Sequence, residues 1–66
     1  MRLIAKLRTE RGLTRARLGA ISEVHPARVG QIESGRVIPY APELGRIARA
    51  LRWQGEPRRL LEEAEE

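Results

Sequence analysis

Apolar side chains recur along this chain at spacings of three and four residues, the period of an amphipathic helix. The longest series is Leu44, Ile47, Ala48 and Leu51, which follows the i, i+3, i+4, i+7 rule. No segment alternates between apolar and polar residues as a half-buried strand does. The pattern predicts an all-α fold with an aliphatic core, whose expected members are Leu3, Leu7, Leu18, Ile21, Val29, Ile32, Leu44, Ile47 and Leu51.

Glycine and proline mark the ends of the predicted helices. Gly12, Gly35 and Gly55 each follow an apolar series, where a residue that tolerates a left-handed conformation ends a helix. Pro26 and Pro57 each precede a series, and proline is favoured at the first helical position. The five predicted helices cover about residues 2–11, 16–22, 26–34, 42–54 and 57–65, with a loop over residues 36–41. Residues 1–66 therefore form a single domain.

The composition points away from a metal site, a disulfide or an enclosed active site. The 66 residues include no cysteine and a single histidine, His25, which cannot form a metal cluster alone. Neither paired catalytic groups nor a phosphate-cradling glycine loop is visible in the sequence. We expect no enzyme and no cofactor. The longest apolar run, residues 3–5, is too short to span a membrane, so we expect a cytoplasmic protein.

Charge is distributed unevenly along the chain. Residues 1–55 hold eleven basic and four acidic side chains, a formal charge of +7, whereas residues 56–66 carry −3. Twelve of the thirteen basic residues are arginine, whose guanidinium group binds phosphate bidentately. This bias favours a polyanionic partner. A GC-rich genome or a hot habitat would explain the arginines equally well, and composition alone does not separate these interpretations.

Residues 14–34 contain two short helices joined by a tight turn, which is the arrangement of a helix-turn-helix. A family resemblance rests on Thr14-Arg15-Ala16-Arg17-Leu18, the run from Val24 to Gly35, Pro39, Leu44, Ile47-Ala48 and Ala50-Leu51. Over about residues 3–53 the chain resembles the phage-repressor or Cro-type helix-turn-helix family, also called the Xre family. The resemblance implies a lambda-repressor-like five-helix domain, in which the third helix enters the DNA major groove. It also implies a structural salt bridge between Arg8 and Glu33.

The third predicted helix has an outward flank suited to reading bases. At 100° per residue, Ala27 and Gln31 lie opposite the core side, and Arg28 lies at the margin. The Gln31 amide can donate and accept at once, as adenine N6 and N7 require, and the resemblance implies a base contact there. Arg28 fits either a guanine edge or a phosphate. Ala27 fits a thymine methyl or simply allows close approach, and Pro26 offers a rigid surface at the groove.

Five further residues are predicted to contact phosphate. Arg15 and Arg17 occupy the first turn of the second helix, where the helix dipole disfavours cations unless an anion binds there. Thr14 is the expected N-cap of that helix. His25 is the expected N-cap of the third helix, suited to capping or to a phosphate hydrogen bond rather than to catalysis. Arg36 lies in the following loop. For the arginines, extension into solvent is the alternative.

The sequence departs from the family pattern at three places. Glu23 stands in the turn where glycine is usual, and a left-handed conformation there costs about 1 kcal/mol. Gly19 replaces the usual alanine on the second helix and allows close approach to the third. Arg52-Trp53 replaces a glycine-hydrophobic pair, so we expect a different junction before the last helix.

The predicted function is that of a transcriptional regulator, with repression the expected direction, acting on double-stranded DNA at the nucleoid. One domain contacts few base pairs, so we expect a homodimer on a palindromic operator with half-sites about 34 Å apart. Leu60 and Leu61 are the expected dimer surface, and Trp53 either joins this surface or caps the core. The alternative is an antitoxin or adaptor whose C-terminal helix binds a protein partner, which the acidic tail favours.

Overall fold

The computed structural model describes residues 1–65 and confirms the all-α prediction. Its elements are α1 (Leu3–Glu10), α2 (Arg15–Ser22), α3 (Pro26–Ser34), α4 (Ala41–Ala50) and a short 3-10 helix, η1 (Pro57–Leu61). The first three helices begin and end within one residue of the predicted bounds. None of the described helices is long and apolar enough to cross a membrane.

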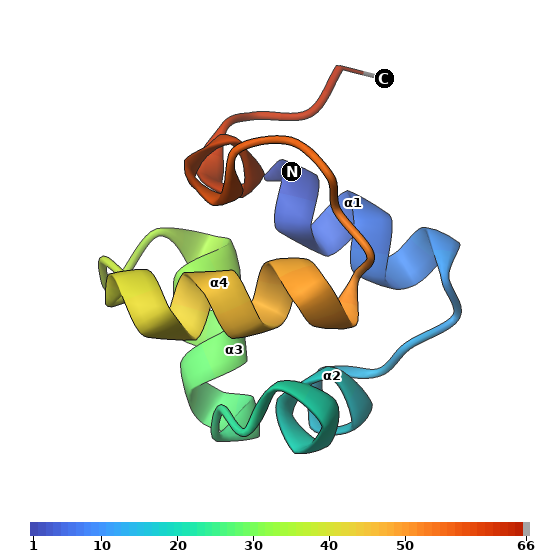
Figure 1. The fold of residues 1–66 in the computed structure, drawn as a ribbon, viewed down its shortest axis with the longest axis vertical. Helices are drawn as coiled ribbons and strands as arrows, with labels where there is room; N and C mark the ends of the chain where they lie inside the picture. Colours follow the sequence, from blue (N-terminus) through green and yellow to red (C-terminus); the bar gives the residue numbers. More distant parts are fainter. Residues whose placement is uncertain (66) are drawn as a thin grey trace.

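The helices surround one aliphatic core. In Figure 1, α4 runs across the middle in front of α3, with α2 below and with α1 and η1 above. Helix α2 packs against both α3 and α4, and η1 packs against α1 and α4. The buried apolar side chains are Ile4, Ala5, Leu18, Val24, Val29, Ile32, Leu44, Ile47, Ala48, Leu51 and Leu60. Most of the predicted core is thus confirmed, with Leu3 and Leu7 packed at its edge.

One predicted core residue is exposed. Ile21 has 49% of its surface accessible, whereas the neighbouring Ser22 is buried at 2%. The inward side of α2 therefore consists of Leu18, Gly19 and Ser22. The Ser22 hydroxyl donates to the Leu18 carbonyl at 2.6 Å, so a polar side chain is accommodated inside while the isoleucine faces outward.

The turn between α2 and α3 explains two departures from the family pattern. Glu23 adopts the expected left-handed conformation with φ of 59° and ends α2. Gly19 lies so close to the turn that a Cβ atom there would be 2.4 Å from the Val24 carbonyl oxygen. The glycine thus permits a close approach of α2 to the backbone that begins α3.

Helix α4 ends earlier than predicted. It stops at Ala50, with Leu51 as its C-cap, rather than continuing to Gly55. Arg52 takes the left-handed position with φ of 56°, and the Trp53 N–H donates to the Ala48 carbonyl at 2.8 Å. An arginine therefore performs the helix-ending role that glycine usually has.

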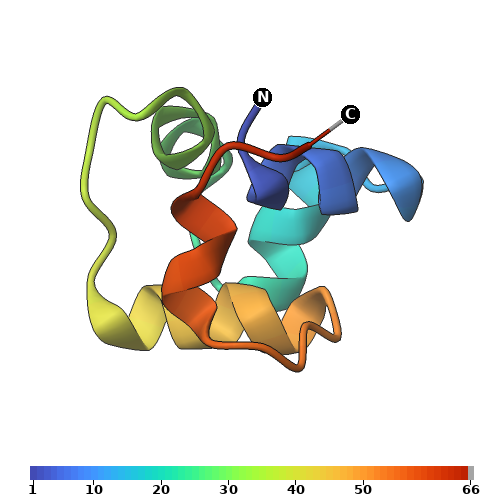
Figure 2. The ribbon, with the colours of Figure 1, turned by 90° about the horizontal axis from the view of Figure 1, so that it is seen from above.

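The predicted fifth helix over residues 57–65 is corrected by the structure. Only a 3-10 helix over Pro57–Leu61 forms, and the following residues are extended. The backbone instead pairs with the amino terminus, because Leu3 N–H donates to Glu62 at 2.8 Å and Ala64 N–H to Met1 at 2.9 Å. These hydrogen bonds replace the expected helical ones. The carboxylates of this segment would lie at the negative end of the helix dipole, which disfavours a helix here. Figure 2 shows the amino terminus and the segment that follows η1 on the same side of the molecule.

Within residues 57–65, the C-terminal segment therefore has no exposed apolar helical face. Leu60 is fully buried, and Leu61 and Trp53 pack against the core. The Trp53 indole N–H donates to the Glu56 carbonyl at 2.9 Å. The prediction that Leu60 is available to a partner is wrong, because this side chain is buried inside the domain. Trp53 packs against the core, which is the other role that the sequence predicts for it.

Candidate nucleic-acid interface

Helix α3 separates a buried side from an exposed one, as the sequence predicts. It buries Val29, Ile32 and Glu33. Pro26, Ala27 and Gln31 are exposed, so the three predicted base-reading residues other than Arg28 lie on an open flank. Because these side chains are exposed, they can approach base edges in a major groove about 12 Å wide.

Side chains cap the first turns of both helices of the unit. The Thr14 hydroxyl accepts a hydrogen bond from the Arg17 N–H at 3.0 Å. The His25 imidazole accepts one from the Ala27 N–H at 3.1 Å through Nδ1. Both predicted N-cap roles are confirmed. Each cap satisfies one amide of its helix. In α2 the Arg15 and Ala16 amides remain available to an anion, whereas in α3 Pro26 has no N–H and the Arg28 N–H donates to the His25 carbonyl at 2.9 Å.

A buried carboxylate links three helices behind this flank. The Glu33 side chain is only 3% exposed and accepts from Arg8 Nε at 2.6 Å, which confirms the predicted salt bridge. It also accepts from Arg15 Nε at 2.9 Å. Arg15 remains 57% exposed, so one of its five donors is held by Glu33 and the guanidinium group still reaches solvent. Arg15, which is predicted to contact phosphate, is thereby held by a buried side chain of α3.

Arg28 is held by a partner that the sequence did not indicate. Its Nε and Nη2 atoms donate to the two Glu43 carboxylate oxygens at 2.5 and 2.9 Å. Its guanidinium lies over the Tyr40 ring, 5.2 Å from the centroid, within cation–π range. Glu43 also accepts from the Tyr40 N–H at 2.8 Å, at the start of α4. Arg28 is thus fixed at the junction of α3 and α4.

The ion pair shifts both ionisation equilibria. The hydrogen bond from Arg28 lowers the pKa of Glu43, aided by the Tyr40 N–H and opposed by desolvation. The same bond raises the pKa of Arg28. Both groups are therefore charged at neutral pH. The available sequence signal was the glutamate at the third position of a helix, which is typical of a capping box but does not identify an arginine partner.

Arg17 and Arg36 are the free cations of the predicted set. Both are exposed, and neither forms an ion pair within residues 1–65. Each can therefore approach a phosphate without first breaking a contact. Within residues 1–65, no group of three or more side chains is placed to bind a metal ion.

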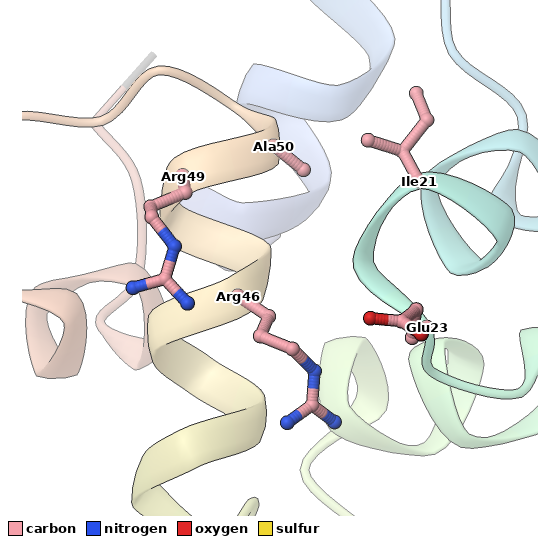
Figure 3. A pocket seen from close by; sticks show the side chains of 5 residues that line it. All are labelled: Ile21, Glu23, Arg46, Arg49 and Ala50. Carbon is pink, nitrogen blue, oxygen red and sulfur yellow. The ribbon is translucent and has the colours of Figure 1, made fainter.

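A separate hollow lies between α2 and α4. Figure 3 shows Arg46, Arg49 and Ala50 of α4 on one side and Ile21 and Glu23 on the other. A neighbouring hollow shares Ile21 and Ala50 and is also lined by Arg11, Leu13 and Arg52. Arg46 is fixed by a hydrogen bond from Nε to the Ser22 carbonyl at 2.8 Å. None of the predicted DNA contacts lines either hollow.

Two packed helices with a tight turn, an exposed flank on the second and arginines around it define a helix-turn-helix DNA-binding domain. Comparison with protein families agrees with this class. The chain matches the helix-turn-helix domain model over residues 2–61, and it belongs to that family. Neither the comparison with curated proteins nor that with solved structures gave a match.

Proposed function

We propose that this protein is a transcriptional repressor that reads an operator in double-stranded DNA through the exposed flank of α3. The observation that carries the proposal is the position of Gln31, exposed on α3 while the opposite side of the helix is buried. Arg15 and Arg17 in the first turn of α2 and Arg36 directly after α3 are exposed cations for the phosphate backbone. The protein acts by binding rather than by catalysis, in the cytoplasm.

We propose further that two copies bind one palindromic operator. The molecule measures 27 × 24 × 22 Å, less than the roughly 34 Å of one helical turn of DNA, so one copy covers a half-site. Ile38 and Tyr40, in the loop between α3 and α4, are 86% and 70% exposed. This loop stands away from the helices in Figure 2. Its apolar side chains are the expected contact between copies.

Selection of bound sequences from a random DNA pool tests the proposal directly. We expect a palindromic consensus, and Gln31→Ala should relax the preference at one base position in each half-site. If Arg15, Arg17 and Arg36 contact phosphate in both copies, about six phosphates are neutralised. The logarithm of the DNA-binding constant should then fall with log salt at a slope near −5. Binding without any enriched sequence would contradict operator reading.

Sedimentation of the protein with its selected operator tests the dimer. Two copies should bind each palindrome, and Ile38→Asp should weaken binding of the second copy while leaving a single half-site unaffected. One copy per palindrome at high micromolar protein would exclude the homodimer.

A second function, binding of a protein partner, is favoured by the hollow beside Ile21. Its two parts contain four arginines, one glutamate and an apolar floor that includes Ile21 and Ala50. Charge complementarity favours an acidic segment that inserts an apolar side chain. A labelled synthetic peptide of alternating glutamate pairs and leucines should bind, and Ile21→Asp should abolish binding. Ile38→Asp is the matched control, because Ile38 is exposed elsewhere.

A further inference from the structure

We propose that Arg28 reads a guanine in the major groove and that Glu43 is the positioning residue that holds its guanidinium group for this contact. The inference rests on the proposed function and deepens it, since it assigns one base of the operator. Its basis is the ion pair between α3 and α4, which fixes an arginine at the margin of the reading flank.

The hydrogen bonds to Glu43 leave one edge of the Arg28 guanidinium group free, the edge that can bind a guanine. Glu43 occupies the side-on edge, formed by Nε and Nη2 of Arg28. The end-on edge, formed by Nη1 and the second Nη2 hydrogen, has no partner within residues 1–65. A planar guanidinium group carries five donors in a fixed fork. The end-on pair has the geometry that binds guanine O6 and N7 together.

The charge of the pair favours a base over a phosphate. Arg28 and Glu43 together are formally neutral, and the carboxylate would repel a phosphate placed beside it. A neutral guanine edge requires only two aligned hydrogen-bond donors, and the end-on edge of Arg28 still supplies them. Arg17 and Arg36 have no such carboxylate in the described residues and remain suited to phosphate. The contact that the sequence left open for Arg28 is thereby resolved toward guanine.

Glu43 and Tyr40 restrict the motion of Arg28 before DNA arrives. Glu43 is itself fixed by the Tyr40 N–H at 2.8 Å, and the Tyr40 ring lies 5.2 Å below the guanidinium carbon. The Arg28 side chain is 29% exposed, so it is partly enclosed yet reachable. A long side chain ordered in advance loses less conformational entropy on binding.

Competition binding against the selected operator tests the inference. Each half-site should contain one guanine whose replacement by adenine weakens wild-type binding about tenfold or more, since that is the value of a bidentate base contact. Arg28→Ala should remove this discrimination at that position alone. Glu43→Gln should reduce it while retaining an amide oxygen for the Tyr40 N–H at the start of α4. Arg36→Ala is the control and should weaken all sequences equally.

The salt dependence separates guanine from phosphate as the ligand of Arg28. Glu43→Gln leaves the arginine uncompensated, so the slope should steepen by up to about 2 per dimer. If Arg28→Ala instead flattens the slope and leaves base preference unchanged, the phosphate contact is established and the guanine assignment is wrong. If Glu43→Gln keeps full guanine discrimination, the positioning role is wrong. Absence of any sequence preference in the wild type would overturn the proposed function and, with it, this inference.

Discussion

At the scale of single residues, two glutamates hold two arginines of the interface, Arg15 and Arg28. Glu33 lies buried and joins Arg8 to Arg15, whereas Glu43 joins Arg28 to the start of α4. The first pair was predictable, because the family resemblance implies it. The second was not, because its members lie fifteen residues apart on either side of a loop whose shape the sequence does not specify. The sequence therefore predicted which arginines belong to the interface, but it did not predict that Glu43 is the partner that orients Arg28.

Replacement of Glu33 should destabilise the domain strongly. Glu33→Gln removes the charge that compensates Arg8, whose side chain is 13% exposed. Breaking one partner of a buried pair costs about 3–5 kcal/mol. Urea denaturation should show this loss in the free energy of unfolding. Arg15→Ala is the control, since that side chain is 57% exposed and should cost about 1 kcal/mol or less. Equal losses in both variants would contradict the assignment of Glu33 as a buried anchor.

The lowered pKa of Glu43 predicts an acid-dependent contribution to stability. Since the hydrogen bond from Arg28 lowers the folded-state pKa, the unfolded chain binds more protons on acidification. The contribution is therefore present above the unfolded glutamate pKa of about 4.3 and is lost as the pH falls through the lower folded value. Denaturation between about pH 5 and 3 should show a steeper loss in wild type than in Glu43→Gln. Glu10→Gln, an exposed helical carboxylate, should retain the wild-type steepness.

At the scale of helices, end signals located α1, α2 and α3, but not the end of α4 or the last segment. Glycine, proline and the Thr14 cap act within a few residues, so they can be recognised from sequence alone. Arg52 took the left-handed position that Gly55 was expected to fill. The segment after Leu61 is controlled by backbone pairing with the far end of the chain. The predicted core position of Ile21 was also wrong: Ser22 is buried instead, with its hydroxyl bonded to the Leu18 carbonyl.

Two helical glycines should respond oppositely to alanine. At Gly19 a Cβ would meet the Val24 carbonyl oxygen at 2.4 Å, so the turn would have to shift. We expect Gly19→Ala to destabilise by about 1–3 kcal/mol, as overpacking does. At Gly45 the nearest atom is Arg49 Nη1 at 3.9 Å, and alanine should stabilise by about 0.5–1 kcal/mol. Thermal unfolding of both variants measures the contrast, and stabilisation by Gly19→Ala would show that the turn yields easily.

At the scale of the whole molecule, the acidic tail closes the fold and offsets its positive charge. Residues 62–64 pair with the amino terminus, and Lys6 Nζ donates to the Glu65 carbonyl at 2.7 Å. The charge asymmetry was visible in the sequence. The pairing was not, because it depends on contacts between residues at opposite ends of the chain.

Removal of residues 62–66 should lower stability and raise non-specific DNA affinity. The Leu3–Glu62 and Met1–Ala64 hydrogen bonds are lost, and each contributes about 0.5–1.5 kcal/mol. Four carboxylates are also removed, so the formal net charge rises by four. Binding to a random duplex at low salt should therefore strengthen. Replacing the four glutamates by glutamine keeps the backbone bonds and should reproduce only the gain in affinity. A stable truncated protein would show that the pairing contributes little.

The pairing of the amino terminus with residues 62–64 also determines how the domain can be joined to other chains. Because Met1 and Ala64 are hydrogen-bonded neighbours, a polypeptide enters and leaves the folded unit at one place. A host protein can thus carry the unit as an insertion within a surface loop, because the two points of attachment in that loop need not move apart. A short bridge between the same two points can close the backbone into a ring, with new termini opened between α3 and α4.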